Sequence, residues 1–337
     1  MKVITINALR QIINQVGLHR FLNEVILSLE EDLRRWNEFH KSPRHATHYP
    51  QGAIELMPCS DDNLYAFKYI NGHPTNTRRG KLSVIGLGLL ADTDSGYPLM
   101  LSEMTLLTAF RTAAVTALGA KYLARSDSRS LALVGTGAQA EFQVLACQAL
   151  LPLESIYYYD LDIKAMDKFA ANARKHVERV VPCKNIAEAV NNADIVITAT
   201  AAKQRAQLIS REMISPGVHI HALGGDCPGK TELDPELLRL CKIVVEYLPQ
   251  SKHEGEIQNL SDISVHGELW ELVTGRKSGR QNEHEITLFD AVGFALEDFS
   301  ILRLVYQLAS ELGIGDELAL IPSVSDPKNL FNLLDLP

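Results

Sequence analysis

A glycine-rich motif near the middle of the chain has the composition of a dinucleotide-binding turn. Gly135-Thr136-Gly137-Ala138-Gln139-Ala140 follows the short apolar stretch Leu131–Val134 and precedes an expected helix. This is the G-x-G-x-x-[G/A] pattern in the strand–turn–helix context that it requires. In that context Gly135 permits a tight turn, Gly137 lets backbone N–H groups approach a pyrophosphate, and Ala140 allows close packing of helix on strand.

An acidic residue follows at the spacing that such a motif needs. Asp160 lies 20 residues after Ala140, at the end of the next expected strand. A carboxylate there accepts a hydrogen bond from a ribose 2′-OH and repels a 2′-phosphate, and no arginine occurs in Leu161-Asp162-Ile163 to reverse that preference. The pattern therefore predicts NAD rather than NADP, the alternative being a glycine-rich turn beside a solvated aspartate.

A second loop with reactive side chains follows a later strand of the same region. Leu223–Glu232 contains two glycines together with Asp226 and Lys230. Ligands of parallel sheets bind at the carboxyl ends of the strands, so this loop is a candidate site for acid–base chemistry. Taken alone, an aspartate in such a turn is more often a residue that caps its own backbone than a catalytic group.

Two other clusters are predicted to be structural. His219 and His221 would point to one face of a strand, but no carboxylate or cysteine has the spacing to complete a metal site, so we expect no metal. Cys227 has no identifiable histidine base and is expected to be a small packing residue.

The elements that must position these residues follow two different patterns of secondary structure. From Ser130 onward, short apolar strands alternate with helices, which predicts an α/β fold with a Rossmann-type, doubly wound parallel sheet. The N-terminal part instead places an amphipathic helix before a set of strands and a second helix, an α+β unit. Its expected helices are Leu18–Trp36 and Thr105–Ala124, and its main strands are Ala53–Pro58, Leu64–Asn71 and Leu82–Ala91.

We therefore expect two domains. A substrate-binding and dimerisation domain would comprise residues 1–125 and about 300–337, and a nucleotide-binding domain would comprise residues 126–299. The final amphipathic helix, Glu297–Leu312, would return the chain to the first domain.

Composition narrows the class of protein. The chain has 337 residues, 46% of them apolar, and a net charge of −8 without a basic stripe, which argues against a nucleic-acid partner. The longest apolar runs, such as Val84–Ala91, are shorter than the roughly 18 residues of a membrane span. With no export signal at the N-terminus and five scattered cysteines lacking a C-x-x-C pair, a cytoplasmic enzyme is expected.

Several segments together resemble the bacterial ornithine cyclodeaminases of the ornithine cyclodeaminase/mu-crystallin family. The resemblance runs over nearly the whole chain. It rests on Gly52–Pro58, Phe67–Pro74, Ser102-Glu103 with Arg111–Ala114, Gly224–Glu232, Glu254–Gln258 and Phe289–Asp298.

The resemblance implies a homodimer with a site between the two domains and assigns roles to individual residues. Asp226 matches the catalytic acid/base; Arg44, Lys68 and Arg111 match cations that bind a substrate carboxylate; Glu55 and Val292 match further substrate contacts. Cofactor contacts match Ser83, Ala138, Gln139, Thr200, Ile220, His221, Ala222, Leu223 and Lys230, and Ala291 stands where the family has a serine that touches the cofactor. From sequence alone, Arg111 on an alanine-rich helix and Lys68 between Phe67 and Tyr69 are also compatible with solvated positions.

The implied reaction converts L-ornithine to L-proline and ammonia, with tightly bound NAD as an internally recycled hydride carrier. Alternatives on the same scaffold are a lysine cyclodeaminase, an NAD-dependent alanine dehydrogenase or a ketimine reductase. Lysine is the hardest of these substrates to distinguish from ornithine, because one methylene contributes only about 1–3 kcal/mol of discrimination. A binding protein of the crystallin type without turnover is a further alternative, and Asp226 argues against it.

Overall fold

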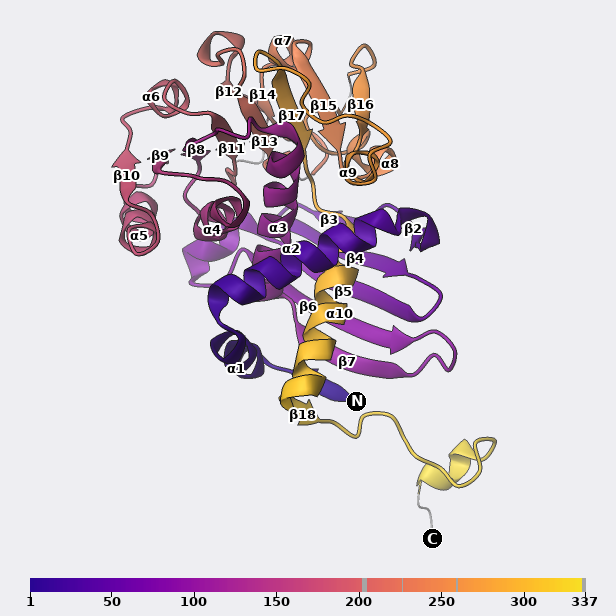
Figure 1. The fold of residues 1–337 in the computed structure, drawn as a ribbon. Coiled ribbons are helices and arrows are strands. Elements are labelled where there is room, and N and C mark those ends of the chain that lie inside the picture. Colours follow the sequence, from indigo (N-terminus) through magenta and orange to yellow (C-terminus); the bar gives the residue numbers. More distant parts are fainter. Residues whose placement is uncertain (202–204, 226, 259, 335–337) are drawn as a thin grey trace.

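The computed structural model describes residues 1–201, 205–225, 227–258 and 260–334, which form two eight-stranded sheets and a small two-stranded one (Figure 1). The first large sheet has the order β18-β1-β7-β6-β5-β4-β2, with β3 also paired to β4, and is antiparallel except where β1 meets β7. Its strands are β1 (Lys2–Ile4), β2 (His40–Lys41), β3 (His45–Tyr49), β4 (Gly52–Ser60), β5 (Leu64–Gly72), β6 (Val84–Asp92), β7 (Pro98–Glu103) and β18 (Asp316–Glu317).

Helices cover one face of this sheet and leave the other open. The covering elements are α1 (Ile6–Val16), α2 (Leu18–Arg34), α3 (Thr105–Leu123) and α10 (Ala295–Leu312), and α10 crosses β4, β5 and β6 (Figure 1). Because side chains alternate along a strand, Met57, Ala66 and Leu90 are buried on the helix side, whereas Leu56 and Leu87 are exposed on the opposite side.

The second large sheet is entirely parallel, as the strand–helix alternation predicts, with the order β10-β9-β8-β11-β13-β17-β15-β16. Leu131 and Leu133 pack with α4 (Ala140–Leu150) and α5 (Ile163–Ala173) on one face. Ala132 and Val134 pack with α6 (Ile186–Val190) and α7 (Pro235–Leu238) on the other. The sheet is therefore doubly wound. Its strands are β8 (Ser130–Val134), β9 (Ser155–Tyr159), β10 (Arg179–Pro182), β11 (Ile195–Thr198), β13 (His219–Ala222), β15 (Cys241–Val245), β16 (Val265–Glu268) and β17 (Ile286–Asp290).

The remaining elements connect these strands. Helices of this part are α4 (Ala140–Leu150), α5 (Ile163–Ala173), α6 (Ile186–Val190), α7 (Pro235–Leu238), α8 (Leu248–Ser251) and α9 (Leu269–Val273), and β12 (Arg205–Ile209) pairs with β14 (Thr231–Leu233). Short 3₁₀ turns occur at Trp36–Glu38, Pro74–Arg79, Arg211–Met213 and Leu330–Leu334. Within the part of the chain described here, no helix combines the length and apolar character needed to cross a membrane.

The return to the first sheet occurs earlier than the sequence suggested. Helix α10 begins at Ala295 rather than Glu297, and the expected boundary near residue 299 falls inside it. Its first two turns are buried, including Leu296, Phe299 and Leu302. The chain therefore crosses from the second sheet to the first in the few residues between β17 and α10, and two acids, Glu297 and Asp298, follow in the first turn of α10.

Candidate functional site

Lys68 lies on the covered face of the first sheet. Its side chain is fully buried, and Nζ is 2.8 Å from Oδ1 of Asp298 in the first turn of α10. Burial, together with the nearby positive charge of Arg111, lowers the pKa of Lys68 to about 8, although Asp298 opposes the shift. A solvated position for Lys68 is therefore wrong, because the pleat turns it toward α10 while Phe67 and Tyr69 point to the other face.

Arg111, from α3, pairs with the same carboxylate. Its Nη1 is 2.5 Å from Oε2 of Glu297, and its Nε is 3.1 Å from the Asp298 oxygen that also pairs with Lys68. The guanidinium packs so closely on Gly293 that a Cβ at that residue would lie 2.6 Å from Nη1. Arg111 is thus buried and held by two carboxylates, and the solvated alternative is wrong for it too.

Arg44, which precedes β3, completes the set. Nη1 donates to Glu55 on β4 at 3.0 Å, and Nε pairs with Glu254 at 3.3 Å. Nη2 donates to the carbonyls of Val292 and, at 2.8 Å, Gly293. The structure thereby brings Arg44, Glu55 and Val292 together, as the resemblance implies.

Arg44, Lys68 and Arg111, which we call the cation cluster, come from three separate elements and meet around residues 292–298. Arg44 and Arg111 both contact Gly293, and Lys68 and Arg111 share Asp298. Two guanidinium forks and an ammonium in a largely dehydrated place match the needs of a carboxylate ligand, since charge-assisted hydrogen bonds gain strength as water is excluded.

The glycine loop lies at the point where the strand order of the second sheet reverses, between β8 and β11. Gly135 has a φ of +99°, and a Cβ there would lie 2.7 Å from the carbonyl oxygen of Ala199. A Cβ at Gly137, in contrast, would meet no atom within 4 Å. Gly135 is thus required by the protein itself, whereas Gly137 leaves space beside its backbone, as the approach of a pyrophosphate requires.

Asp160 borders this loop at the end of β9. Its Oδ2 accepts hydrogen bonds from the backbone N of Thr136 at 2.6 Å and from Oγ1 of the same residue at 3.1 Å, and Oδ1 accepts one from Asp162 N at 3.0 Å. Lys168 of α5 donates to the carbonyls of Thr136 and Gly137, each at 2.9 Å. Asp160 therefore holds the loop in shape, and Oδ1, which accepts one hydrogen bond, retains a lone pair for a further donor.

The other expected cofactor residues gather at the neighbouring strand ends. Lys230 Nζ donates to the Thr200 carbonyl at 2.8 Å, and Leu223 N donates to Thr198 O at 3.0 Å. Ala291 N donates to Ala222 O at 3.0 Å, next to Ile220 and His221 on β13. Ala138 and Gln139 belong to the glycine loop, while Ser83 directly precedes β6 of the first sheet, and its carbonyl accepts from His73 N at 2.7 Å.

Asp226 lies outside the described residues, but the chain on both sides of it is held firmly. Gly255 N donates to Gly225 O at 2.6 Å, and Gln258 binds Gly229 N at 2.6 Å and Lys230 O at 2.7 Å. The loop is thereby fastened to residues 255–258, one of the segments that carry the resemblance.

The two histidines of β13 are core residues. His221 Nε2 is 3.0 Å from Oγ1 of Thr116, and His219 Nδ1 is 3.0 Å from Oγ1 of Thr287. Burial lowers the pKa of His219 to about 3 and that of His221 well below its ordinary value, so both rings are neutral. Among the described residues, no group of three or more metal-binding side chains occurs.

Sequence reasoning missed the acidic partners of the cation cluster: Glu246, Glu254, Glu297 and Asp298. The sequence could have indicated two of them. Glu297 and Asp298 are the charged residues of a mainly apolar stretch, 294–302, that is buried along its length. Acids in such a stretch must be paired, so their presence predicts buried cations. Nothing in the sequence shows which cations those are.

Comparison with known proteins finds relatives of similar length. The family model described as "Ornithine cyclodeaminase/mu-crystallin family" matches residues 7–313. The chain is 47% identical over 331 residues to an ornithine cyclodeaminase of Brucella melitensis, covering 98% of this chain and 92% of that protein.

Two solved structures have closely similar folds. A lysine cyclodeaminase, described in a study of its recognition of L-lysine, L-ornithine and L-2,4-diaminobutyric acid, matches with a TM-score of 0.92 and 28% identity over 98% of both chains. An archaeal alanine dehydrogenase, solved as a dimer with bound NAD, matches with a TM-score of 0.87 and 30% identity, covering 95% of this chain and 99% of that one.

Proposed function

This chain belongs to the ornithine cyclodeaminase/mu-crystallin family, and from that premise we propose that it converts L-ornithine to L-proline and ammonia. The observation that carries the proposal is the convergence of the cation cluster on residues 292–298, because an α-amino acid presents a carboxylate that needs such a set of donors. The 47% identity to an ornithine cyclodeaminase favours ornithine as the substrate.

We propose NAD as the cofactor, held by the glycine loop, Asp160, Thr200 and Lys230. The open space beside Gly137 and the carboxylate at the end of β9 fit a dinucleotide with a free ribose 2′-OH. When bound, NAD would supply the redox chemistry, as the acceptor of hydride from Cα of ornithine and the donor of hydride to the cyclic imine. Ala291 offers no hydroxyl to this cofactor, so the hydrogen bond that a serine would provide there is missing.

The chain's own residues bind, orient and move protons. The cation cluster fixes the carboxylate, and Glu55, paired with Arg44 at the edge of the cluster, is placed to attract an amine of the substrate. With both ends fixed, the δ-amine is held near Cα, which makes ring closure an intramolecular step. We assign Asp226 the proton transfers that accompany ring closure and release of the α-nitrogen as ammonia.

The principal alternatives are a lysine cyclodeaminase and a dehydrogenase or ketimine reductase on the same scaffold. Identity to the lysine cyclodeaminase and the alanine dehydrogenase is 28% and 30%, against 47% for the ornithine cyclodeaminase, which favours the ornithine reaction.

The test is product analysis with purified protein, trace NAD⁺ and either L-ornithine or L-lysine. Ornithine deuterated at Cα and labelled at the δ-nitrogen should yield proline that retains both labels, with no accumulation of NADH. A keto acid with stoichiometric NADH would instead identify a dehydrogenase. Asp226→Asn should lower turnover by about 10²–10⁴-fold while leaving NAD affinity, measured by fluorescence titration, unchanged.

We further propose a homodimer formed through the open face of the first sheet. Leu56 on β4, Tyr69 on β5 and Leu87 on β6 are cross-strand neighbours on that face, and Ile85 lies beside them. Leu56, Ile85 and Leu87 are 42–53% exposed, an apolar row that a second copy of the sheet would cover.

The scattered cysteines and the absence of a basic stripe support a cytoplasmic protein without a nucleic-acid partner.

A further inference from the structure

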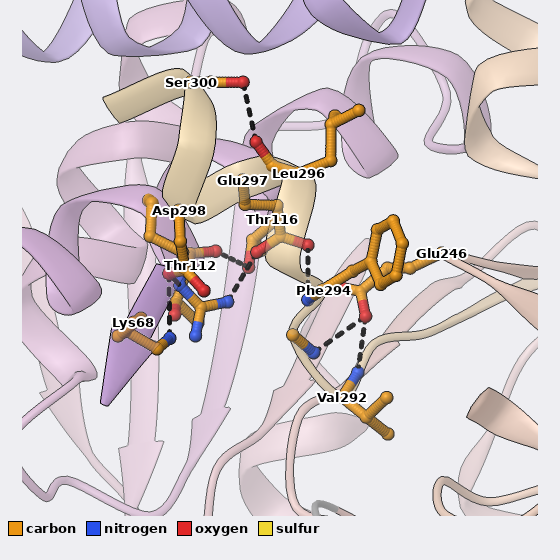
Figure 2. Close-up of polar contacts among 12 residues, drawn as sticks. Lys68, Thr112, Thr116, Glu246, Val292, Phe294, Leu296, Glu297, Asp298 and Ser300 are labelled. Carbon is orange, nitrogen blue, oxygen red and sulfur yellow. Dashed lines mark hydrogen bonds and ion pairs between the residues drawn. The ribbon is translucent and has the colours of Figure 1, made fainter. Parts of the chain in front are cut away.

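Glu246 is a buried acid that links two parts of the site and has no role in the reaction described above. It follows β15 directly, and only 4% of its surface is exposed. Its Oε2 accepts hydrogen bonds from the backbone N of Val292 at 2.9 Å and of Gly293 at 2.7 Å. Figure 2 shows this carboxyl between that turn and the first turn of α10.

The turn at residues 292–293 is held from both sides. Glu246 binds its two N–H groups, while Arg44 binds both of its carbonyls and Gln250 donates to Gly293 O at 2.9 Å. Since Arg44 is anchored to these carbonyls, a displacement of the turn displaces the guanidinium. Glu246 therefore acts on one member of the cation cluster through the backbone.

Glu246 also faces Glu297, which fixes a second member. Glu297 accepts from Phe294 N at 3.2 Å through Oε1 and pairs with Arg111 through Oε2. Oε1 of Glu246 is buried and accepts a hydrogen bond from no donor in the described part of the chain. Two carboxylates facing each other without a cation between them would repel, unless one carries a proton and donates it to the other.

The charges of the buried set agree with such a proton. Among the described residues, Lys68 and Arg111 are the cations that pair with Glu297 and Asp298, while Arg44 pairs with Glu55 and Glu254. If Glu246 were ionised as well as Glu297 and Asp298, these pairs would leave an uncompensated negative charge. The charged groups that act on Glu246 are Glu297 of α10 and Arg111 of α3. Burial first, and then the charge of Glu297, raise the pKa of Glu246 well above its ordinary value, in line with the geometry.

We propose that Glu246 is a positioning residue that is kept as the neutral carboxylic acid. Its O–H donates to Glu297, and its second oxygen holds the turn at residues 292–293. Through these two contacts it keeps Arg111 and Arg44 in the geometry in which they bind the substrate carboxylate, so this inference rests on the proposed function.

The test compares Glu246→Gln with Glu246→Ala. The amide is neutral, accepts through oxygen and donates through nitrogen, so Glu246→Gln should keep kcat/KM for ornithine within about threefold. Glu246→Ala should raise the KM for ornithine by about 10–100-fold with a smaller change in kcat and in NAD affinity. Glu271→Gln is the matched control, because Glu271 also accepts a backbone N–H, from Glu268 at 2.9 Å, but on α9.

Infrared difference spectroscopy reads the protonation state directly. The spectrum of the unmodified protein minus that of Glu246→Gln should contain the absorption of one protonated carboxyl group at neutral pH. Absence of that band, or equal impairment of the Gln and Ala variants, would overturn the proposal. If the protein converts no ornithine, the proposed function fails, while the infrared band and the affinity of both variants for pentanoate, a plain carboxylate, still decide the role of Glu246.

Discussion

The glycine loop of the second sheet is shaped by residues that are close in sequence, whereas the cation cluster is shaped by ionised side chains from distant segments. Residues 135–140 with Asp160 and Lys168 form the first region, within one strand–helix–strand–helix unit. The second region needs residues 44, 68, 111 and 292–298, and each of its cations is paired with an acid of the chain. The glycine loop thus offers uncharged backbone N–H groups to a ligand. The cation cluster offers charged groups, so the chain must also supply acids that neutralise them.

This difference explains what the sequence could and could not predict. The glycine loop and the parallel sheet follow from spacing and alternation, because strand, turn and helix are contiguous. The cations were predicted from family resemblance. Their burial could not be predicted locally, because Lys68 is covered by α10, and its partner Asp298 in that helix is 230 residues away in sequence. The start of α10 was misplaced because Phe294 and Ala295 continue the apolar pattern of the preceding strand.

The largest expected effect comes from removing one acid of the cation cluster. Asp298→Ala leaves Lys68 and Arg111 facing each other without their shared carboxylate, and breaking a buried pair of this kind costs about 3–5 kcal/mol. The free energy of unfolding, measured with urea, should fall by an amount in that range. Deprotonation of Lys68, whose pKa is about 8, limits the loss by removing one of the two charges.

The matched control for that experiment is Asp262→Ala. Asp262 also pairs with an arginine, Arg239, at 2.7 Å, but both side chains are exposed. Exposed pairs are screened by water, so the control should be close to the unmodified protein in stability. Equal stability of the two variants would contradict the view that the cluster depends on buried charge balance.

The glycine loop offers an intermediate effect that separates folding from binding. Gly135→Ala places a Cβ 2.7 Å from Ala199 O at a φ of +99°, and should cost about 1–3 kcal/mol of stability. Gly137→Ala fills open space, so stability should be retained while NAD affinity falls by about tenfold or more. Calorimetric titration with NAD⁺ and thermal unfolding measure the two quantities, and a Gly137 variant with undiminished NAD affinity would contradict the assigned role of the loop.

The smallest effect concerns the pH dependence of carboxylate binding at Lys68. Burial and the charge of Arg111 lower the pKa of Lys68 to about 8, so the ammonium is present below that pH and is lost above it. Binding of a carboxylate should therefore weaken as the pH rises through 8. If only the protonated form binds, the Kd for pentanoate, which stays ionised throughout, should increase about fourfold between roughly pH 7 and pH 8.5. Lys68→Arg keeps its charge over this range and should flatten the profile, although the larger side chain weakens binding at every pH. The same pH slope in both proteins would show that another group controls the carboxylate, and the cation cluster would then bind through Arg44 and Arg111 alone.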